Sequence, residues 1–270
     1  MQGTLRKMTT TLSDVVEYAL PIGEQSLPLN SLLNRPLELE FLGSIYCKNC
    51  DRKTKKSFSQ GYCYPCMKSL AACDLCILKP EQCHFHQGTC REPDWGERNC
   101  MVDHVVYLAN TSALKVGITR QSQIPTRWMD QGATEALPIY RVKTRHLSGL
   151  VEVELAKQMS DKTNWRAMLK GGNDPIDLQE AARQVRPQID EQIQSLWKDH
   201  GDDAVQPLDA EVTTIRYPVN KYPTKIKSFN FDKAPLVSGT LMGIKGQYLI
   251  FDTGVINIRK FAGYEIEARA

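Results

Sequence analysis

The stretch that decides the fold of the central part of the chain reads VVYLANTSALKVGIT, from Val105 to Thr119. It holds two short apolar runs, Val105–Leu108 and Leu114–Ile118. Between them, Asn110, Thr111 and Ser112 are residues typical of turns. Two apolar runs separated by a polar turn predict a β-hairpin.

The residues that follow predict helices packed on this hairpin. Residues 122–130 predict a short helix that ends at Gly132, and residues 139–144 predict a third strand. Residues 151–159 carry an apolar stripe at helical spacing. We therefore expect an α+β fold in which a small mixed sheet is covered by helices.

The two ends of the chain differ from this centre. Short apolar runs between Pro, Gly and Asn residues predict strands in residues 1–46 and again from about residue 211. We expect these β-rich ends to pack together as one small barrel. Between centre and end, Asp174 is expected to cap a helix that Pro187 kinks. The expected segments are β-rich 1–46, zinc-binding 47–104, mixed 105–173, acidic helical 174–210 and β-rich 211–270.

The composition is that of an ordinary globular protein. The chain has 270 residues, 41% hydrophobic and 24% charged, which excludes a disordered or collagen-like chain and suits one or two domains. No apolar run approaches the roughly 18 residues of a membrane helix, and the first residues contain no apolar signal core. We therefore expect a cytoplasmic protein.

All nine cysteines lie between Cys47 and Cys100. An odd number of thiols in a reducing compartment argues against a disulfide scaffold. Cys47-x2-Cys50 and Cys63-x2-Cys66, twelve residues apart, form a pattern typical of a four-thiolate zinc site. We predict one zinc ion on these four residues.

A second zinc ion is predicted on the next cysteines, Cys73, Cys76, Cys83 and Cys90. His84, His86 and Cys100 remain alternatives for one of these ligands. Four-ligand zinc sites are closed, so neither ion is expected to take part in chemistry. Their expected role is to fold a stretch that has few large apolar residues.

Charge is distributed unevenly, although the formal net charge is only +3. Residues 45–72 contain six Lys and Arg against one acid, residues 115–146 six against two, and residues 216–233 five against one. Residues 174–211 compensate with ten acids and three bases. Basic segments on a zinc-binding module favour binding to phosphate groups, so we expect a nucleic-acid partner.

Residues 105–159 resemble a remote GIY-YIG nuclease domain. The resemblance is carried by Val105-Val106-Tyr107 as first strand, Lys115-Val116-Gly117-Ile118-Thr119 as second strand, Thr126-Arg127-Trp128 on a helix, and Glu152 on a later helix. With zinc knuckles directly before this segment, the whole chain also resembles an uncharacterised bacterial family known only as a domain of unknown function.

The GIY-YIG resemblance implies metal-dependent hydrolysis of phosphodiester bonds. It implies that Tyr107 activates water, that Arg127 holds the scissile phosphate and that Glu152 binds one Mg²⁺ or Mn²⁺ ion. A free Tyr titrates near ~10, so Tyr107 needs a nearby cation, for which Lys115 across the hairpin is the candidate. His104 is the alternative base.

Three functions follow, from different classes. The first is a divalent-metal-dependent endonuclease acting on DNA or RNA. The second is a non-catalytic nucleic-acid-binding protein with the same fold. The third is a thiol-based sensor that releases zinc on oxidation.

Overall fold

The hairpin predicted from residues 105–119 is the centre of the fold. The computed structural model describes residues 1–160, 162–172 and 174–270, so the expected segment boundary at residue 173 lies outside the described residues. Strands β7 (His104–Asn110) and β8 (Leu114–Arg120) pair antiparallel, with Tyr107 opposite Gly117 and Ala109 opposite Lys115. Lys115 is therefore not the cross-strand partner of Tyr107.

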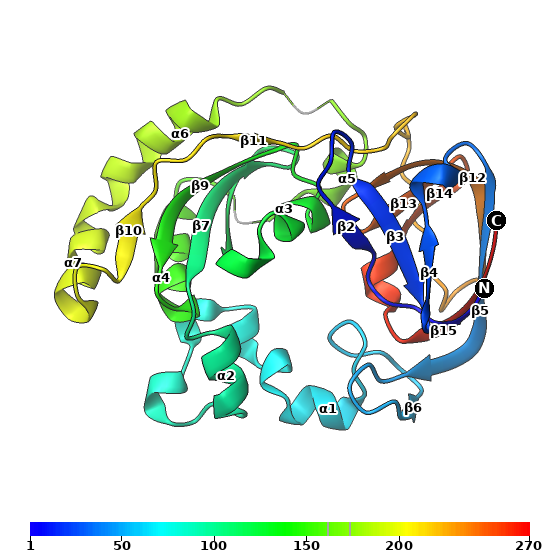
Figure 1. Ribbon diagram of the computed structural model, residues 1–270, viewed down its shortest axis with the longest axis horizontal. Helices are drawn as coiled ribbons and strands as arrows, with labels where there is room; N and C mark the ends of the chain where they lie inside the picture. The colour runs from blue at the N-terminus through cyan, green and yellow to red at the C-terminus, as the bar shows by residue number, and fades with distance from the viewer. Residues whose placement is uncertain (161, 173) are drawn as a thin grey trace.

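A mixed α and β architecture surrounds this hairpin, as expected for the α+β class (Figure 1). Within the described residues the central sheet has the order β10-β9-β7-β8, with β11 also paired to β9. Its remaining strands are β9 (Glu135–Val142), β10 (Val205–Pro207) and β11 (Thr213–Thr214). Strand β8 therefore forms an edge of the sheet.

Helix α4 (Arg145–Leu155) covers one face of the central sheet. It begins six residues before the predicted helix, because the Thr144 side chain accepts a hydrogen bond from the Leu147 amide and caps the helix there. Its buried residues Val151 and Leu155 pack with apolar residues of β7 and β8. Val151 and Leu155 of the predicted stripe are thus on the buried face of α4, but the helix ends at Leu155, short of the predicted residue 159.

The acidic segment also covers this face. Asp177, not Asp174, caps helix α6 (Leu178–Val185), since its carboxylate accepts from the Glu180 amide at 2.9 Å. Pro187 interrupts the helical path as predicted, with a 3₁₀ turn η7 (Arg186–Ile189) before helix α7 (Asp190–His200).

The two chain ends share an open sheet. Its order is β1-β15-β5-β12-β13-β14, with β6 paired to β5. Its strands are β1 (Gln2–Thr4), β5 (Pro36–Tyr46), β6 (Lys53–Thr54), β12 (Leu236–Lys245), β13 (Tyr248–Phe251), β14 (Gly254–Asn257) and β15 (Tyr264–Arg269). The expected pairing of the ends is confirmed, but the barrel is wrong: in the described residues β1 and β14 are ends of the sheet and do not pair.

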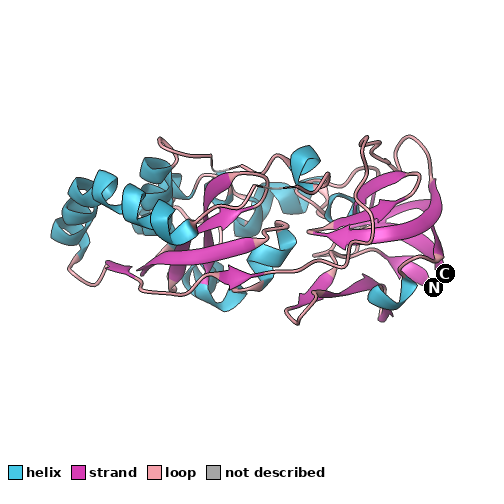
Figure 2. Ribbon diagram, turned by 90° about the horizontal axis from the view of Figure 1, so that it is seen from above, coloured by secondary structure: helices cyan, strands magenta, loops and turns pink. Residues whose placement is uncertain are grey.

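A smaller antiparallel sheet, β2 (Thr9–Thr11), β3 (Glu17–Ile22) and β4 (Gln25–Pro28), lies beside this open sheet. Figure 2 shows the larger helices toward one end of the molecule and the terminal sheets at the other. One hydrophobic core nevertheless joins them, since Tyr107 and Trp128 pack in the same cluster as Leu20 and Phe251. Helix α3 (Thr126–Asp130) stands at this junction.

The cysteine-rich segment runs along the lower side of Figure 1 and connects the two halves. It contains helices α1 (Tyr64–Ser69) and α2 (Pro93–Asn99) and 3₁₀ turns η2 (Ala71–Cys73), η3 (Leu75–Ile77), η4 (Pro80–Gln82) and η5 (Phe85–Gln87). Elsewhere lie η1 (Asn30–Leu32), η6 (Gln121–Gln123), α5 (Trp165–Met168) and η8 (Ile258–Phe261). Among the helices described, none is long and apolar enough to cross a membrane.

Candidate metal centres and a basic cleft

The first predicted zinc site is assembled as the spacing indicates. The Sγ atoms of Cys47, Cys50, Cys63 and Cys66 all lie within 4.8 Å of one another, and those of Cys50 and Cys63 are 3.8 Å apart. Four thiols gathered at one point are a donor set suited to tetrahedral Zn²⁺. This part of the chain can therefore hold a zinc ion.

Local backbone geometry positions these thiols. The Asp51 amide donates to the Cys47 carbonyl at 2.9 Å, which closes the first knuckle as a tight turn. Burial raises the pKa of Cys47, but hydrogen bonds from the backbone amides of Cys63, Asn49 and Cys50 outweigh it and lower that pKa to about 6. These amides favour the thiolate, which is the form of cysteine that binds a metal ion.

The second predicted set is divided. Cys76, Cys83 and Cys90 line one small cavity together with Cys100. Cys73 is not among the residues that line this cavity. Burial raises the pKa of Cys73, while its neighbours Ser59 and Lys48 lower it. Of the alternatives, His86 does not line this cavity and stacks on His146 with ring centroids 5.7 Å apart. His84 does line it, and its ring nitrogen lies within 4.8 Å of the ligand atoms of Asp74 and Cys76.

A cleft of about 470 Å³ lies between the central sheet, the cysteine-rich segment and the terminal sheets. Three of the four predicted catalytic residues line it, namely Lys115, Arg127 and Glu152. Its other charged lining residues are Lys7, Arg120, Asp130, Arg145 and Arg259. Six cationic side chains therefore face two carboxylates in one cavity, which favours an anionic ligand.

Arg127 lies on α3 and is held by its neighbour one turn later. With the Gln131 amide oriented to satisfy both partners, its Oε1 accepts from Arg127 Nη2 at 3.1 Å and Nε at 3.2 Å, while its Nε2 donates to Tyr107 Oη at 2.8 Å. The cis peptide between Ile124 and Pro125 directly precedes this helix. Gln131 thus links Arg127 in the cleft to Tyr107 behind it.

Tyr107 is fully buried and does not line the cleft. Gly117 makes room for it, because a Cβ at Gly117 would lie 2.7 Å from Tyr107 Oη. Burial raises the pKa of Tyr107 to about 12; Arg127 lowers it and Glu152 raises it, but neither outweighs burial. The cation near this phenol is therefore Arg127, and the phenol is protonated at neutral pH.

His104, the alternative base, is also fully buried. Its Nδ1 is 2.7 Å from the Val102 carbonyl, and in the described part of the chain its Nε2 has no hydrogen-bond partner. Burial is the main reason that its pKa is lowered to about 4. The imidazole is neutral at pH 7, and it does not line the cleft.

Comparison with known proteins places the chain in a family. A profile of the family described as "Protein of unknown function (DUF2797)" matches residues 34–266. The chain belongs to this family. No curated protein and no solved structure matched the chain. The DUF2797 description names no activity, so function has to be argued from the cleft.

Sequence patterns missed several cleft residues of this DUF2797 chain. Lys7 and Arg259 come from the terminal segments, and no local motif marks them. Lys7 Nζ lies 2.6 Å from Asp130 on α3, where Gln247 also donates to the same carboxylate at 2.8 Å. Only the packing of the chain ends against α3 brings these residues together.

Proposed function

We propose that this protein is a divalent-metal-dependent nuclease that hydrolyses phosphodiester bonds in DNA or RNA. The observation that supports this most is the convergence of Lys115, Arg127 and Glu152 on one basic cleft beside the cysteine-rich segment. These residues come from a hairpin, a short helix and a long helix in the order that the GIY-YIG resemblance implies.

Arg127 is proposed to bind the scissile phosphate. A guanidinium offers a planar fork of donors that matches two phosphate oxygens. Arg259 lines the same cleft as Arg127, so both cations are available to one anion bound there. Lys115, 3% exposed, adds a positive charge at the cleft wall.

Glu152 is proposed to bind Mg²⁺ or Mn²⁺. Its carboxylate lines the cleft, and carboxylate oxygen is a hard ligand suited to a hard cation. One carboxylate with waters and substrate phosphate is a usual ligand set for Mg²⁺. The bound ion would lower the pKa of its water and neutralise charge on the phosphate.

Tyr107 is better suited to positioning than to accepting a proton. A base has to be deprotonated, and a pKa of about 12 opposes this near neutral pH. Its hydroxyl instead accepts from Gln131 Nε2, and Gln131 Oε1 in turn accepts from Arg127, which holds the guanidinium in place. Loss of Tyr107 would therefore weaken phosphate binding through Arg127.

The cysteine-rich segment is proposed to hold the nucleic-acid backbone. The loop between the first two knuckles presents exposed Arg52, Lys53 and Lys55. Phosphate contacts of this kind add affinity without reading the base sequence. The partner is therefore expected to be nucleic acid of loose sequence preference.

The test is a cleavage assay on single- and double-stranded DNA and RNA with Mg²⁺ or Mn²⁺. Wild type is compared with Arg127→Ala and Glu152→Ala, and with Arg183→Ala as a control, because Arg183 pairs with Glu180 on the exposed side of α6. Cleavage by wild type and control alone supports the proposal. Absence of cleavage of every substrate by wild type sinks it.

One observation favours a second function, binding without cleavage. Both residues considered as base, Tyr107 and His104, lie behind the cleft and not in it. A protein that grips a phosphate backbone needs the cations but no base. Retained binding with no cleavage in the same assay would select this function.

A further inference from the structure

We propose that Cys76, Cys83, Cys90 and Cys100 hold a second zinc ion and that Arg145 is the counter-charge of this site. This inference concerns the fold of the cleft wall and does not depend on nuclease activity. It changes the ligand set that spacing alone indicates, since Cys100 replaces Cys73.

The four thiols surround one small cavity. Its volume is about 10 Å³, close to the roughly 10–15 Å³ needed to hold a single water. Cys83 and Cys100 are buried, and Cys76 and Cys90 are partly buried. Asp74 and His84 also line this cavity, but these four residues are its thiols, and four thiolates are the usual donor set of a structural zinc site.

Cys73 is separate from this grouping. It is not among the residues that line the cavity, and its side chain interacts with Ser59 instead.

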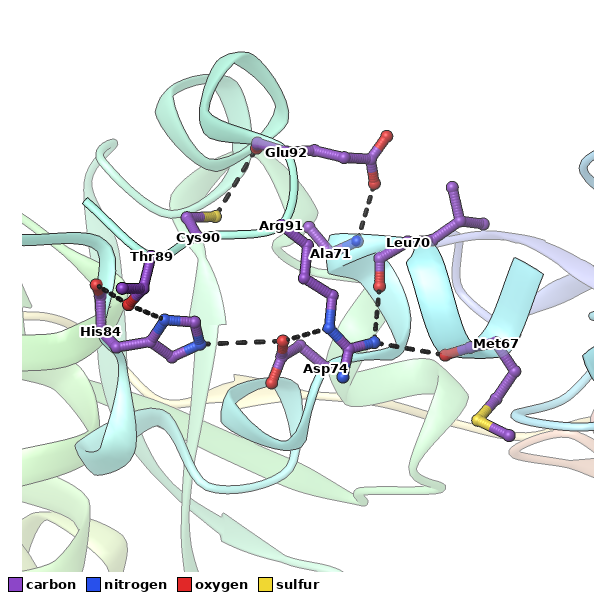
Figure 3. Close-up of polar contacts among 9 residues, drawn as sticks. All are labelled: Met67, Leu70, Ala71, Asp74, His84, Thr89, Cys90, Arg91 and Glu92. Atoms are coloured by element: carbon purple, nitrogen blue, oxygen red, sulfur yellow. Dashed lines mark hydrogen bonds and ion pairs between the residues drawn. The ribbon is translucent and has the colours of Figure 1, made fainter. Parts of the chain in front are cut away.

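The ligand atoms of a competing group, Asp74, Cys76 and His84, lie within 4.8 Å of one another, but two of its members are already engaged. Figure 3 shows the Asp74 carboxylate between the His84 ring and the Arg91 guanidinium. Arg91 Nε lies 2.6 Å from Asp74, and His84 Nδ1 lies 2.7 Å from the Thr89 hydroxyl. Asp74 and His84 thus stabilise the loop through these contacts. The Cys90 thiol makes only a 3.6 Å contact with the Glu92 carbonyl, so it is more available to a metal ion.

Arg145 supplies the independent observation. Its Nη2 donates to the Ile77 carbonyl, next to Cys76, at 2.7 Å, and its amide donates to the Cys100 carbonyl at 2.7 Å. Its Nε is buried without a hydrogen-bond partner in the described residues. Burial lowers the pKa of Arg145, and Cys100 and Cys76 are among the groups that raise it. Zinc with four thiolates carries a net charge of −2, and this buried guanidinium, with a charge of +1, would offset half of it.

The site would therefore form one wall of the basic cleft. Arg145 lines that cleft and lies near Arg127 and Glu152 as well as near the thiols. Binding of the ion requires loss of the thiol protons, so zinc uptake releases protons at neutral pH. The second ion would then hold Arg145 in place for an anion in the cleft.

The experiment is a zinc count on the full-length protein, purified without chelators. Wild type is expected to hold two zinc ions per chain, Cys100→Ser and Cys76→Ser one, and the matched controls Cys73→Ser and His84→Ala two. One ion in wild type would overturn the proposal. So would one ion in Cys73→Ser or His84→Ala with two in Cys100→Ser.

A measurement on the wild type covers the case in which the cysteine variants do not fold. The protein is loaded with ¹¹³Cd²⁺ in place of zinc, and its cadmium resonances are recorded. Two resonances, both in the low-field range of four-thiolate sites, are expected. A resonance at the higher field produced by a nitrogen or oxygen ligand would contradict the four-thiol set.

Discussion

The two cysteine groups of this protein are built in different ways. In the first, Cys47, Cys50, Cys63 and Cys66 come from two local knuckles, and the segment around them contacts the C-terminal part of the chain, for example through the bond from the Ser57 hydroxyl to the Ala262 carbonyl. In the second, the thiols are spread over residues 76–100 and their backbone is tied to Arg145 of α4. The geometry of the first group is set by its own local backbone, whereas that of the second depends on contacts with a wall of the cleft.

The largest expected difference between the groups is in what each loses without its metal. Structural zinc contributes on the order of 10 kcal/mol to the folding of small modules. Cys83→Ser is expected to remove amide protection from residues 73–104 and from α4, and Cys50→Ser only from the knuckles around residues 47–66. Hydrogen exchange measures both, and equal losses in α4 for the two variants would remove the distinction.

Substitution of Arg127 tests whether the scissile phosphate binds at the cleft wall next to the second group. If it holds the scissile phosphate, Arg127→Ala is expected to lower the cleavage rate by roughly 10²–10³-fold, as loss of a transition-state donor does. Single-turnover cleavage measures this, with Arg183→Ala as control. A change below tenfold would show that the phosphate lies elsewhere.

His104 follows directly after the second group and makes stability depend on pH. Its folded-state pKa of about 4 lies below the unfolded value of about 6.5, so the unfolded chain binds the proton first as pH falls. Stability is expected to be complete above pH 6.5 and to fall by about 3 kcal/mol in total between pH 6.5 and 4. Urea unfolding at several pH values measures the slope, and a slope unchanged in His104→Asn would refute the assignment.

Substitution of Gly149 tests how closely α4 packs against the backbone of the segment that carries the second group. A Cβ there would lie 2.4 Å from the Glu81 amide nitrogen and 2.7 Å from the Pro80 carbonyl carbon, both backbone atoms of the cysteine-rich segment. Gly149→Ala is expected to destabilise the fold by about 1–3 kcal/mol. Val153→Ala, at an exposed position on the same helix, is the control and should change unfolding free energy little.

The smallest effect is expected at the first group. Replacing Lys53, Lys55 and Lys56 with Ala should weaken nucleic-acid binding only modestly. The slope of log K against log salt concentration should become shallower by about one for each phosphate that the loop no longer neutralises. Binding titrations at several salt concentrations measure this. An unchanged salt dependence would mean that this loop does not touch the backbone.

The contrast between the groups also explains what the sequence could and could not predict. The first site follows from CxxC spacing, and the hairpin, α4 and the break at Pro187 follow from local patterns. The proposed replacement of Cys73 by Cys100, the burial of Tyr107 and the approach of Lys7 and Arg259 depend on contacts between distant segments. Side-chain period and spacing contain no information about those contacts.

The most direct test of the account compares cleavage by wild type and by Glu152→Gln in Mn²⁺, at equal occupancy of a labelled nucleic acid. Glu154→Gln is the matched control, since Glu154 lies two residues along α4 and pairs with Lys157. The account predicts that Glu152→Gln binds the nucleic acid but does not cleave it, while Glu154→Gln cleaves at the wild-type rate. Cleavage by Glu152→Gln at the wild-type rate, or none by wild type, would contradict it.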